Sequence, residues 1–431
     1  MGGGAAGPPA PPPPGGGVEK RLAFWWGGFS QEGSSQLRRK RRFLRRSLLG
    51  ASAVVLVLVA SPGWGDVAGV ADERILFGQS AAFSGPAEQL GRDMRLGIEA
   101  AFAEANANGG IHGRRLTLLS RDDAYEPEAA IANTRRLIEE DGVFALIGAV
   151  GTPTSRSAAP VAEAAGVPYI APFTGAEFLR SSELQSVVNL RASYYQETEA
   201  MVAHLIEDLD IRDIAVMRQD DSFGLAGYNG VRLAMERRDM ELAATAVYRR
   251  NTTAVKTGVL DLMRAAPGAV ILIGAYEPVA ATIAWSRHLG FDPVFLTISF
   301  VGSNALAGEL GARGDGVFVT QVVPLPSDDL DVVRAYRNAL AAVNQDAAPG
   351  FVSLEGYLAG RLAIVALEGA GAEITRARFL ETLHQAGAID MGGFQLEYGT
   401  DDNQGSDEVF VTVIDPGGSY RSVTNLAEGR R

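Results

Sequence analysis

The sequence of 431 residues contains no cysteine. A chain without cysteine has no disulfide bonds, no thiolate metal ligands, no thiol nucleophile and no lipidated N-terminal cysteine. Histidine is scarce as well, and the four histidines lack metal-ligand spacing: His112, His204, His288 and His384. We therefore predict no metal site and no cofactor.

Catalytic motifs are also missing. The sequence has no G-x-S-x-G, no phosphate-binding G-x-x-x-x-G-K-[ST] and no H-E-x-x-H. Asp122 and Asp123 are adjacent at the end of a predicted strand. Neighbouring side chains on a strand point to opposite faces, which does not suit a paired general acid and base. We therefore predict that the protein is not an enzyme and has no catalytic residues.

Basic residues are scarce outside the N-terminal region. Residues 1–71 carry nine Lys or Arg and three acidic residues, whereas the other 360 residues carry 30 basic and 48 acidic side chains. The net charge is thus +6 in the first part and −18 in the second. An acidic folded part argues against nucleic acid as a partner.

The basic block has the layout of an export signal. RRKRRFLRRS at 38–47 precedes an apolar segment at 48–60, and small residues follow as far as Ala71. The apolar segment is shorter than the roughly 20 residues of a membrane span. We expect a soluble periplasmic protein that is exported by the Sec or the twin-arginine route and is not lipidated. Cleavage after Ala71 is the first choice and cleavage after Ala60 or Gly65 the alternative; an uncleaved anchor is the other interpretation.

The most informative stretch is FALIGAVGTPT at 144–154, an apolar run followed by a turn and a predicted helix at 155–165. A parallel strand that leads into a helix through such a turn presents free N–H groups, hydroxyls and the positive end of the helix at one point. That combination suits a carboxylate. The alternative is that Thr152, Thr154 and Ser155 only cap the helix.

The remaining chain alternates predicted strands and helices, which indicates an α/β protein with parallel sheets covered by helices on both faces. The first strand is expected at 74–80 and the next at 116–119. A second series of alternating elements starts at Tyr194. A hairpin-like segment is expected at 394–414.

Several segments in register carry a family resemblance. GQSAAFSGP near the first strand, FALIGAVGTPTS and VPYIAPFTGAEFL resemble the bacterial periplasmic binding proteins of the leucine/isoleucine/valine-binding family, which includes amide and urea binders. The resemblance covers residues 74–415. It implies the type I periplasmic binding protein fold: two doubly wound, Rossmann-like lobes joined by a three-stranded hinge, with ligand held in the cleft between them.

The resemblance also implies domain boundaries. We expect a leader and signal peptide at 1–71, lobe 1 at 72–190 plus 324–408, lobe 2 at 191–323 plus 409–421, and a C-terminal tail at 422–431. The three chain crossings between the lobes are expected near 187–193, 320–324 and 410–415.

Ligand-binding positions follow from the same resemblance. Thr152 matches the hydroxyl that holds the ligand's carboxylate in the family, with Thr154 and Ser155 nearby. A second turn matches Phe173, Thr174 and Gly175, with Thr174 supplying a hydroxyl. Leu90 matches a cleft-lining position of the first lobe, and Phe223 and Tyr276 match aromatic positions of the second; ordinary core or rim packing is the alternative for those two aromatic residues.

One position departs from the family. Its amino-acid binders place a glutamate, which neutralises the ligand's ammonium, where this chain has Ser299. A buried ammonium without a partner costs several kcal/mol. Unless Asp123, Asp221 or Glu277 substitutes, we expect a carboxylate, amide or urea-like ligand.

The expected function is that of an extracytoplasmic solute-binding protein. It would capture a small polar, amino-acid-like, carboxylate, amide or urea ligand and deliver it to an ABC permease, acting as a monomer. The alternative is a ligand-sensing receptor subunit for a membrane kinase or regulator. The sequence does not distinguish these two partners, because both would use the same ligand site.

Overall fold

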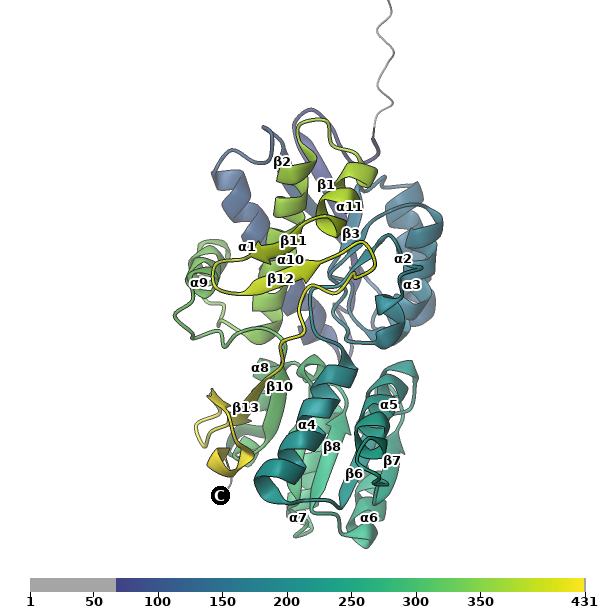
Figure 1. The fold of residues 1–431 in the computed structure, drawn as a ribbon, viewed down its shortest axis with the longest axis vertical. Coiled ribbons are helices and arrows are strands. Elements are labelled where there is room, and N and C mark those ends of the chain that lie inside the picture. The colour runs from purple at the N-terminus through teal and green to yellow at the C-terminus, as the bar shows by residue number, and fades with distance from the viewer. Residues whose placement is uncertain (1–66, 430–431) are drawn as a thin grey trace, which may run out of the picture. The chain divides into compact units, whose positions relative to one another are not determined.

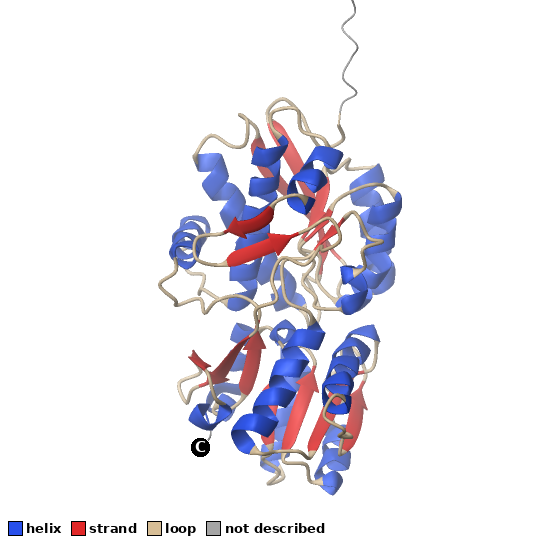
Figure 2. Ribbon diagram, viewed as in Figure 1, coloured by secondary structure: helices blue, strands red, loops and turns tan. Residues whose placement is uncertain are grey.

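The structure, a computed structural model, describes residues 67–429, which lie within one compact unit of the chain. The predicted signal peptide, up to residue 66, lies outside the described residues. Within residues 67–429 no helix is long and apolar enough to cross a membrane. The described chain folds into two lobes (Figure 1), and in each of them helices flank a central sheet (Figure 2).

Lobe 1 contains a five-stranded parallel sheet in the order β2-β1-β3-β4-β5. Its strands are β1 (Arg74–Ala81), β2 (Arg115–Asp122), β3 (Ala145–Ile147), β4 (Tyr169–Ile170) and β5 (Val187–Val188). The central strands are apolar and almost fully buried, as expected for a parallel sheet covered on both faces. Because β1 lies between β2 and β3, the chain reverses its winding direction there.

Six helices belong to lobe 1: α1 (Glu88–Ala107), α2 (Pro127–Glu139), α3 (Thr152–Ala164), α9 (Asp331–Val343), α10 (Phe351–Ala370) and α11 (Arg376–His384). The most extensive packing between helices joins α1 to α10, and α10 is buried along most of its length. A short 3₁₀ helix, η1 (Glu177–Arg180), follows β4. A separate antiparallel pair, β11 (Gly387–Asp390) and β12 (Gln395–Tyr398), completes the lobe.

Lobe 2 contains a seven-stranded sheet in the order β14-β13-β10-β9-β8-β6-β7. Its strands are β6 (Ile214–Gln219), β7 (Ala244–Tyr248), β8 (Ala269–Ile273), β9 (Val294–Thr297), β10 (Phe318–Gln321), β13 (Phe410–Ile414) and β14 (Tyr420–Val423). Its helices are α4 (Tyr194–Leu209), α5 (Ser222–Glu236), α6 (Lys256–Ala265), α7 (Tyr276–His288) and α8 (Ser303–Leu310), with 3₁₀ turns η2 (Ser299–Val301), η3 (Gly311–Gly314) and η4 (Leu426–Gly429). Strand β13 runs antiparallel to both of its neighbours, β10 and β14, whereas the other pairs in this sheet are parallel. The predicted fold of two doubly wound lobes is thereby confirmed.

The predicted hairpin at 394–414 is wrong. Strand β12 pairs with β11 in lobe 1, whereas β13 pairs with β10 and β14 in lobe 2. The two strands are neighbours in sequence and have a turn-rich segment between them, but each pairs with a strand of a different sheet.

The segment between β12 and β13 is instead the third crossing between the lobes. The backbone of Asn189 accepts a hydrogen bond from Gly405 N (2.9 Å) and donates one to Asn403 O (2.7 Å), so this crossing runs beside the first one. The crossing precedes the predicted range of 410–415, because β13 already belongs to the sheet of lobe 2.

The C-terminal residues are part of lobe 2 rather than a tail from 422 onward. Strand β14 continues to Val423, and the Leu426 side chain is fully buried. The Asp208 carboxylate on α4 accepts a hydrogen bond from Leu426 N at 2.8 Å. Residues as far as Gly429 therefore cover one end of α4.

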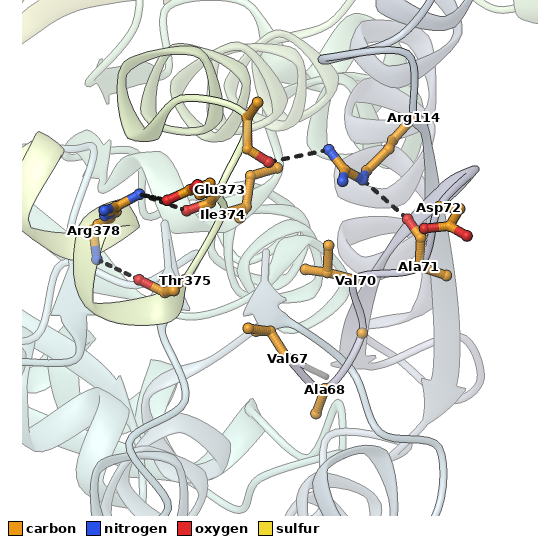
Figure 3. A pocket seen from close by; sticks show the side chains of 12 residues that line it. Val67, Ala68, Val70, Ala71, Asp72, Arg114, Glu373, Ile374, Thr375 and Arg378 are labelled. Atoms are coloured by element: carbon orange, nitrogen blue, oxygen red, sulfur yellow. Dashed lines mark hydrogen bonds and ion pairs between the residues drawn. The ribbon is translucent and has the colours of Figure 1, made fainter. Parts of the chain in front are cut away.

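Residues 67–71, which the sequence assigns to the leader, are built into lobe 1. Val70 forms an antiparallel bridge with Ile75, and Leu76 N donates to Gly69 O at 2.8 Å. Gly69 has a φ of +80°, and a Cβ at this position would lie 2.1 Å from Phe144 N. This segment forms one side of a groove whose other side is the loop before α11 (Figure 3).

Candidate functional site

The carboxyl ends of β3 and β4 place two polar turns side by side. Phe173 N donates to Ala149 O (2.7 Å) and Gly151 N donates to Phe173 O (3.2 Å), which ties the turn after β3 to the turn after β4. The hydroxyls of Thr152 and Thr174 consequently lie 2.7 Å apart. Both side chains are buried.

A third hydroxyl comes from lobe 2. Tyr194 is the first residue of α4, whose N-terminus is fixed by a capping box between Ser193 and Gln196. The Thr174 hydroxyl donates to the Tyr194 hydroxyl at 3.2 Å. Burial raises the pKa of Tyr194 to about 12, so this phenol remains protonated at neutral pH and able to donate. We call Thr152, Thr174 and Tyr194 the hydroxyl cluster.

The side chains of Thr154 and Ser155 do not join this cluster. The Thr154 hydroxyl donates back to Val150 O at 2.5 Å, and the Ser155 hydroxyl accepts a hydrogen bond from the Tyr169 hydroxyl at 3.1 Å. Both bonds lie inside lobe 1. In this structure the hydroxyls of Thr154 and Ser155 are thus engaged within lobe 1, and Thr152 is the side chain of the turn that meets Thr174.

Aromatic rings from both lobes meet next to the hydroxyl cluster. The Phe300 ring lies 4.5 Å from the ring of Phe223, 5.3 Å from that of Phe173 and 6.2 Å from that of Tyr125, measured between centroids. The ring of Tyr194 lies 5.7 Å from Phe223. All five are buried, and together they form what we call the aromatic cluster. Phe173 and Phe223 were predicted; Tyr125, Phe300 and Tyr194 were missed.

Tyr125 reaches the cluster through an unusual backbone conformation. Its φ is +63°, which a bulky residue adopts only under constraint. Its ring lies against Gly151, where an added Cβ would come within 2.2 Å of the ring. Burial raises the pKa of Tyr125, with Asp221 contributing in the same direction and the Gln219 amide opposing it, yet the phenol has no partner of ordinary hydrogen-bond geometry among the described residues.

Ser299 faces the hinge rather than the aromatic cluster. Its N–H and its hydroxyl donate to the Glu197 carboxylate at 2.8 and 2.9 Å, and Arg191 donates to the same hydroxyl. Burial raises the pKa of Glu197, while Arg191 favours its ionised form. Ser299, which stands where the resemblance places a glutamate in amino-acid binders, is thus engaged in a structural network.

Arg191 is the centre of that network. Its guanidinium lies 3.7 Å from Glu197 and 3.6 Å from Glu355 and stacks over the Phe173 ring at 4.7 Å. All three charged side chains are almost completely buried. Burial raises the pKa of Glu355 to about 7 despite the nearby arginine. The network joins the first crossing, α4 and α10, so it fixes the hinge directly behind the aromatic cluster.

Of the three acids that could replace the missing glutamate, Asp123 and Asp221 already accept hydrogen bonds within the fold, whereas Glu277 is surrounded by like charges. The Asp123 carboxylate accepts hydrogen bonds from the Ser80 hydroxyl (2.8 Å) and from Tyr125 N (2.9 Å), and burial raises its pKa to about 7. Asp221 caps α5 by accepting from Phe223 N at 2.9 Å, and it also accepts from Gln219 at 2.7 Å. Glu277 is only half-buried, and its pKa is raised by burial and by the like charges of two neighbouring glutamates.

The lobes touch on both sides of the aromatic cluster. On one side, Leu90 of lobe 1 packs against Gly302 of lobe 2, beside the Tyr276 ring. On the other side, the Glu126 carboxylate of lobe 1 lies 2.6 Å from the Arg250 guanidinium and 2.7 Å from the Asn251 amide of lobe 2. Both contacts bridge the two lobes, so the described conformation is a closed one.

Two surface grooves lie away from the hydroxyl cluster and the aromatic cluster. The groove in Figure 3 has a volume of 1020 Å³ and is lined by Val67–Asp72, Arg114, residues 372–375 and Arg378. A second groove, of 820 Å³, runs between α8 and the start of α10. Neither contains a residue of the two clusters. Within residues 67–429, no group of three potential ligand side chains could hold a metal ion.

Comparisons with known proteins agree with this architecture. The sequence pattern of the periplasmic binding protein family matches residues 75–419. A Leu/Ile/Val-binding protein homolog 7 from Brucella suis is 27% identical over 255 residues, which are 57% of this chain and 61% of the relative. The chain thus spans about three fifths of the length of the curated relatives that it first matches.

Solved structures extend the match to both lobes. The crystal structure of a possible leucine/isoleucine/valine-binding protein from Rhodopirellula baltica is 39% identical, with a TM-score of 0.79, and the match covers 85% of this chain and 99% of that one. A substrate-binding periplasmic protein from Ralstonia solanacearum is 28% identical, with a TM-score of 0.76 over 81% of this chain and 99% of that one. These relatives are solute-binding proteins rather than enzymes. The chain belongs to the periplasmic binding protein family.

Proposed function

We propose that the protein captures a small ligand between its lobes and that a polar, hydrogen-bond-accepting end of this ligand binds the hydroxyl cluster. The observation that carries the proposal is the convergence of Thr152, Thr174 and Tyr194 on one point at the carboxyl ends of two parallel strands. Ligands of open α/β sheets bind at such edges. In the closed structure these hydroxyls bond to one another, and a carboxylate or an amide carbonyl could accept from them instead.

The charges around the site favour a ligand without an ammonium group. An α-amino acid needs a carboxylate partner for its ammonium, because an unpaired buried charge costs several kcal/mol. Ser299 offers none, and Asp123 and Asp221 already hold backbone turns, which leaves the half-buried Glu277 as the one remaining candidate of the three. A small carboxylate, amide or urea-like compound needs no such partner, so we assign the ligand to this class.

Closure couples the ligand to a membrane partner. Contacts such as Glu126 with Arg250 exist only when the lobes meet, so a ligand that touches both lobes stabilises the conformation that has them. A partner that recognises the closed arrangement then responds to ligand. We propose an ABC permease as this partner.

The ligand assignment is tested by calorimetry with Thr152→Val, which removes the hydroxyl and keeps the shape. A panel of short carboxylates, amides, ureas and branched-chain amino acids is first screened by thermal shift, since a ligand stabilises the folded state it binds. We expect Thr152→Val to weaken binding of the best compound by about tenfold, the cost of one good hydrogen bond to a charged group.

Thr154→Val is the matched control, because its hydroxyl is buried two residues away but bonds within lobe 1. It should leave the affinity unchanged. Sub-micromolar binding of leucine, isoleucine or valine would contradict the assigned class. Uptake of the identified ligand that survives deletion of the gene, with loss of a transcriptional response instead, would replace the permease by a sensor as partner.

We further propose that export removes the N-terminal segment before Val67, at the Ala60 or Gly65 site rather than at Ala71. The carbonyl of Ala71 accepts a hydrogen bond from Arg114 at 3.0 Å, and that of Gly69 accepts from Leu76 at 2.8 Å, so cleavage after Ala71 would remove part of lobe 1. The intact mass of the protein recovered from the periplasm decides this. A mature chain that starts at Asp72 would refute the proposal.

A further inference from the structure

We propose that Phe300 determines the size of the ligand, by filling the space between the lobes that the apolar part of a larger ligand would need. The proposal rests on the interlobe binding function proposed above. The Phe300 ring is fully buried and contacts rings from both lobes, Phe173 in lobe 1 and Phe223 in lobe 2. It thus stands between the two surfaces that would hold a ligand.

The neighbours of Phe300 hold its backbone in place. Ser299 on one side is fixed through its N–H and hydroxyl by Glu197. On the other side, Val301 N donates to Ile298 O at 3.0 Å, and Gly302 is packed under Leu90 of lobe 1. The 3₁₀ turn Ser299–Val301 is therefore anchored at both ends. These contacts fix the backbone from which the ring projects, and the ring itself packs against Phe173 and Phe223.

The ring lies close to the polar end of the proposed site. Phe173 directly precedes Thr174 of the hydroxyl cluster, and Phe223 is 5.7 Å from the ring of Tyr194. A ligand whose polar end binds the hydroxyl cluster must therefore share this space with the Phe300 ring. A short side chain at position 300 would leave an apolar cavity lined by aromatic rings, and such cavities accept flat apolar molecules.

The test compares the affinities of Phe300 variants for benzoate and acetate. Benzoate carries the six-membered ring that Phe300→Ala removes, together with a carboxylate for the hydroxyl cluster, whereas acetate has the carboxylate alone. We expect Phe300→Ala to bind benzoate at least about tenfold more tightly than the wild type does, and acetate without such a gain. The affinity of Phe300→Leu for benzoate should lie between those of the wild type and of Phe300→Ala. This variant can still be used if the alanine variant folds poorly.

Phe295→Ala is the matched control. Phe295 is an equally buried phenylalanine on β9 of the same lobe, outside the aromatic cluster. It should gain no affinity for benzoate. Equal benzoate binding by the wild type and both Phe300 variants would overturn the proposal, and so would an equal gain in Phe295→Ala, which would show that any cavity suffices.

Adding Thr152→Val to Phe300→Ala separates this inference from the proposed function. If the gain for benzoate disappears, the carboxylate binds the hydroxyl cluster and both ideas are supported. If the gain remains, Phe300 still limits the space between the lobes, but the polar end of the ligand lies elsewhere and the proposed role of Thr152 fails.

Discussion

The contact of Glu126 with Arg250 and Asn251 should help to keep the lobes closed. One carboxylate oxygen of Glu126 bonds to Arg250 at 2.6 Å and the other to Asn251 at 2.7 Å. The side chains of Arg250 and Glu126 are 24% and 43% exposed, so solvent weakens the ion pair to at most about 1 kcal/mol. With the second hydrogen bond the contact contributes about 1–2 kcal/mol to closure, or a factor of about 5–30 in the ratio of closed to open molecules.

Glu126→Ala removes both bonds and spares the helix cap, because the Glu126 side chain makes no capping bond to α2. Closure can be followed by double electron–electron resonance, which measures the distance between two spin labels. The labels are placed on Arg135→Cys of α2 and Leu260→Cys of α6. Both positions are exposed, and the sequence has no other cysteine to react. We expect a longer distance to gain population in Glu126→Ala at the expense of the closed one.

Arg232→Ala provides the control, because it removes an exposed ion pair with Glu236 that lies within one helix of lobe 2. Its distance distribution should match that of the doubly labelled protein that carries no further substitution. If Glu126→Ala shows the same distribution as the control, the contact does not hold the lobes together and the reasoning about closure is refuted.

Two further predictions concern buried charge. The pKa of Asp123 is raised to about 7 by burial, so the folded state binds this proton more tightly than the unfolded state, and stability is lost as pH rises through 7. In Asp123→Asn the amide oxygen can accept from Tyr125 N, and the amide NH2 can donate to the Ser80 hydroxyl, which then becomes the acceptor. This neutral variant should gain about 2–4 kcal/mol over the wild type at pH 8 and little at pH 4, as measured by urea unfolding; parallel pH curves would contradict this. Arg191→Met should destabilise by about 3–5 kcal/mol because it leaves two buried carboxylates without their cation. Adding Glu355→Gln to Arg191→Met should recover part of the lost stability. If it recovers none, the unpaired charge of Glu355 is not what destabilises Arg191→Met.

The sequence predicted the fold because the fold depends on local patterns, and the same patterns mark the two turns that carry Thr152 and Thr174. Apolar runs that end in turn residues place Thr152 and Thr174 at the same edge of a parallel sheet, and the hydrogen bonds between the two turns bring their hydroxyls together. The same local pattern did not show that Thr154 and Ser155 would turn into lobe 1. Their hydroxyls found partners at Val150 and Tyr169 that only the tertiary structure supplies.

The residues that were missed depend on long-range packing. Tyr125 reaches the site through a positive φ, which cannot be predicted from its sequence. Its ring also requires a glycine at position 151, because a Cβ there would collide with it. In the sequence, Phe300 is one of several apolar residues around Ser299, and no local pattern distinguishes it from them. Arg191 became the centre of a buried network because α4 and α10 each bring a glutamate to it. A clue was available for Phe300, since a large aromatic residue follows directly after a cleft position of the family.

The central claim is that the ligand's polar end binds the hydroxyl cluster between the lobes. Its most direct test is a calorimetric titration of the wild type and Thr152→Val with the panel compound that gives the largest thermal shift. We expect saturable binding of a small carboxylate, amide or urea-like compound, and we expect the substitution to weaken this binding about tenfold. An unchanged affinity in Thr152→Val would contradict the account and return this turn to the role of a helix cap.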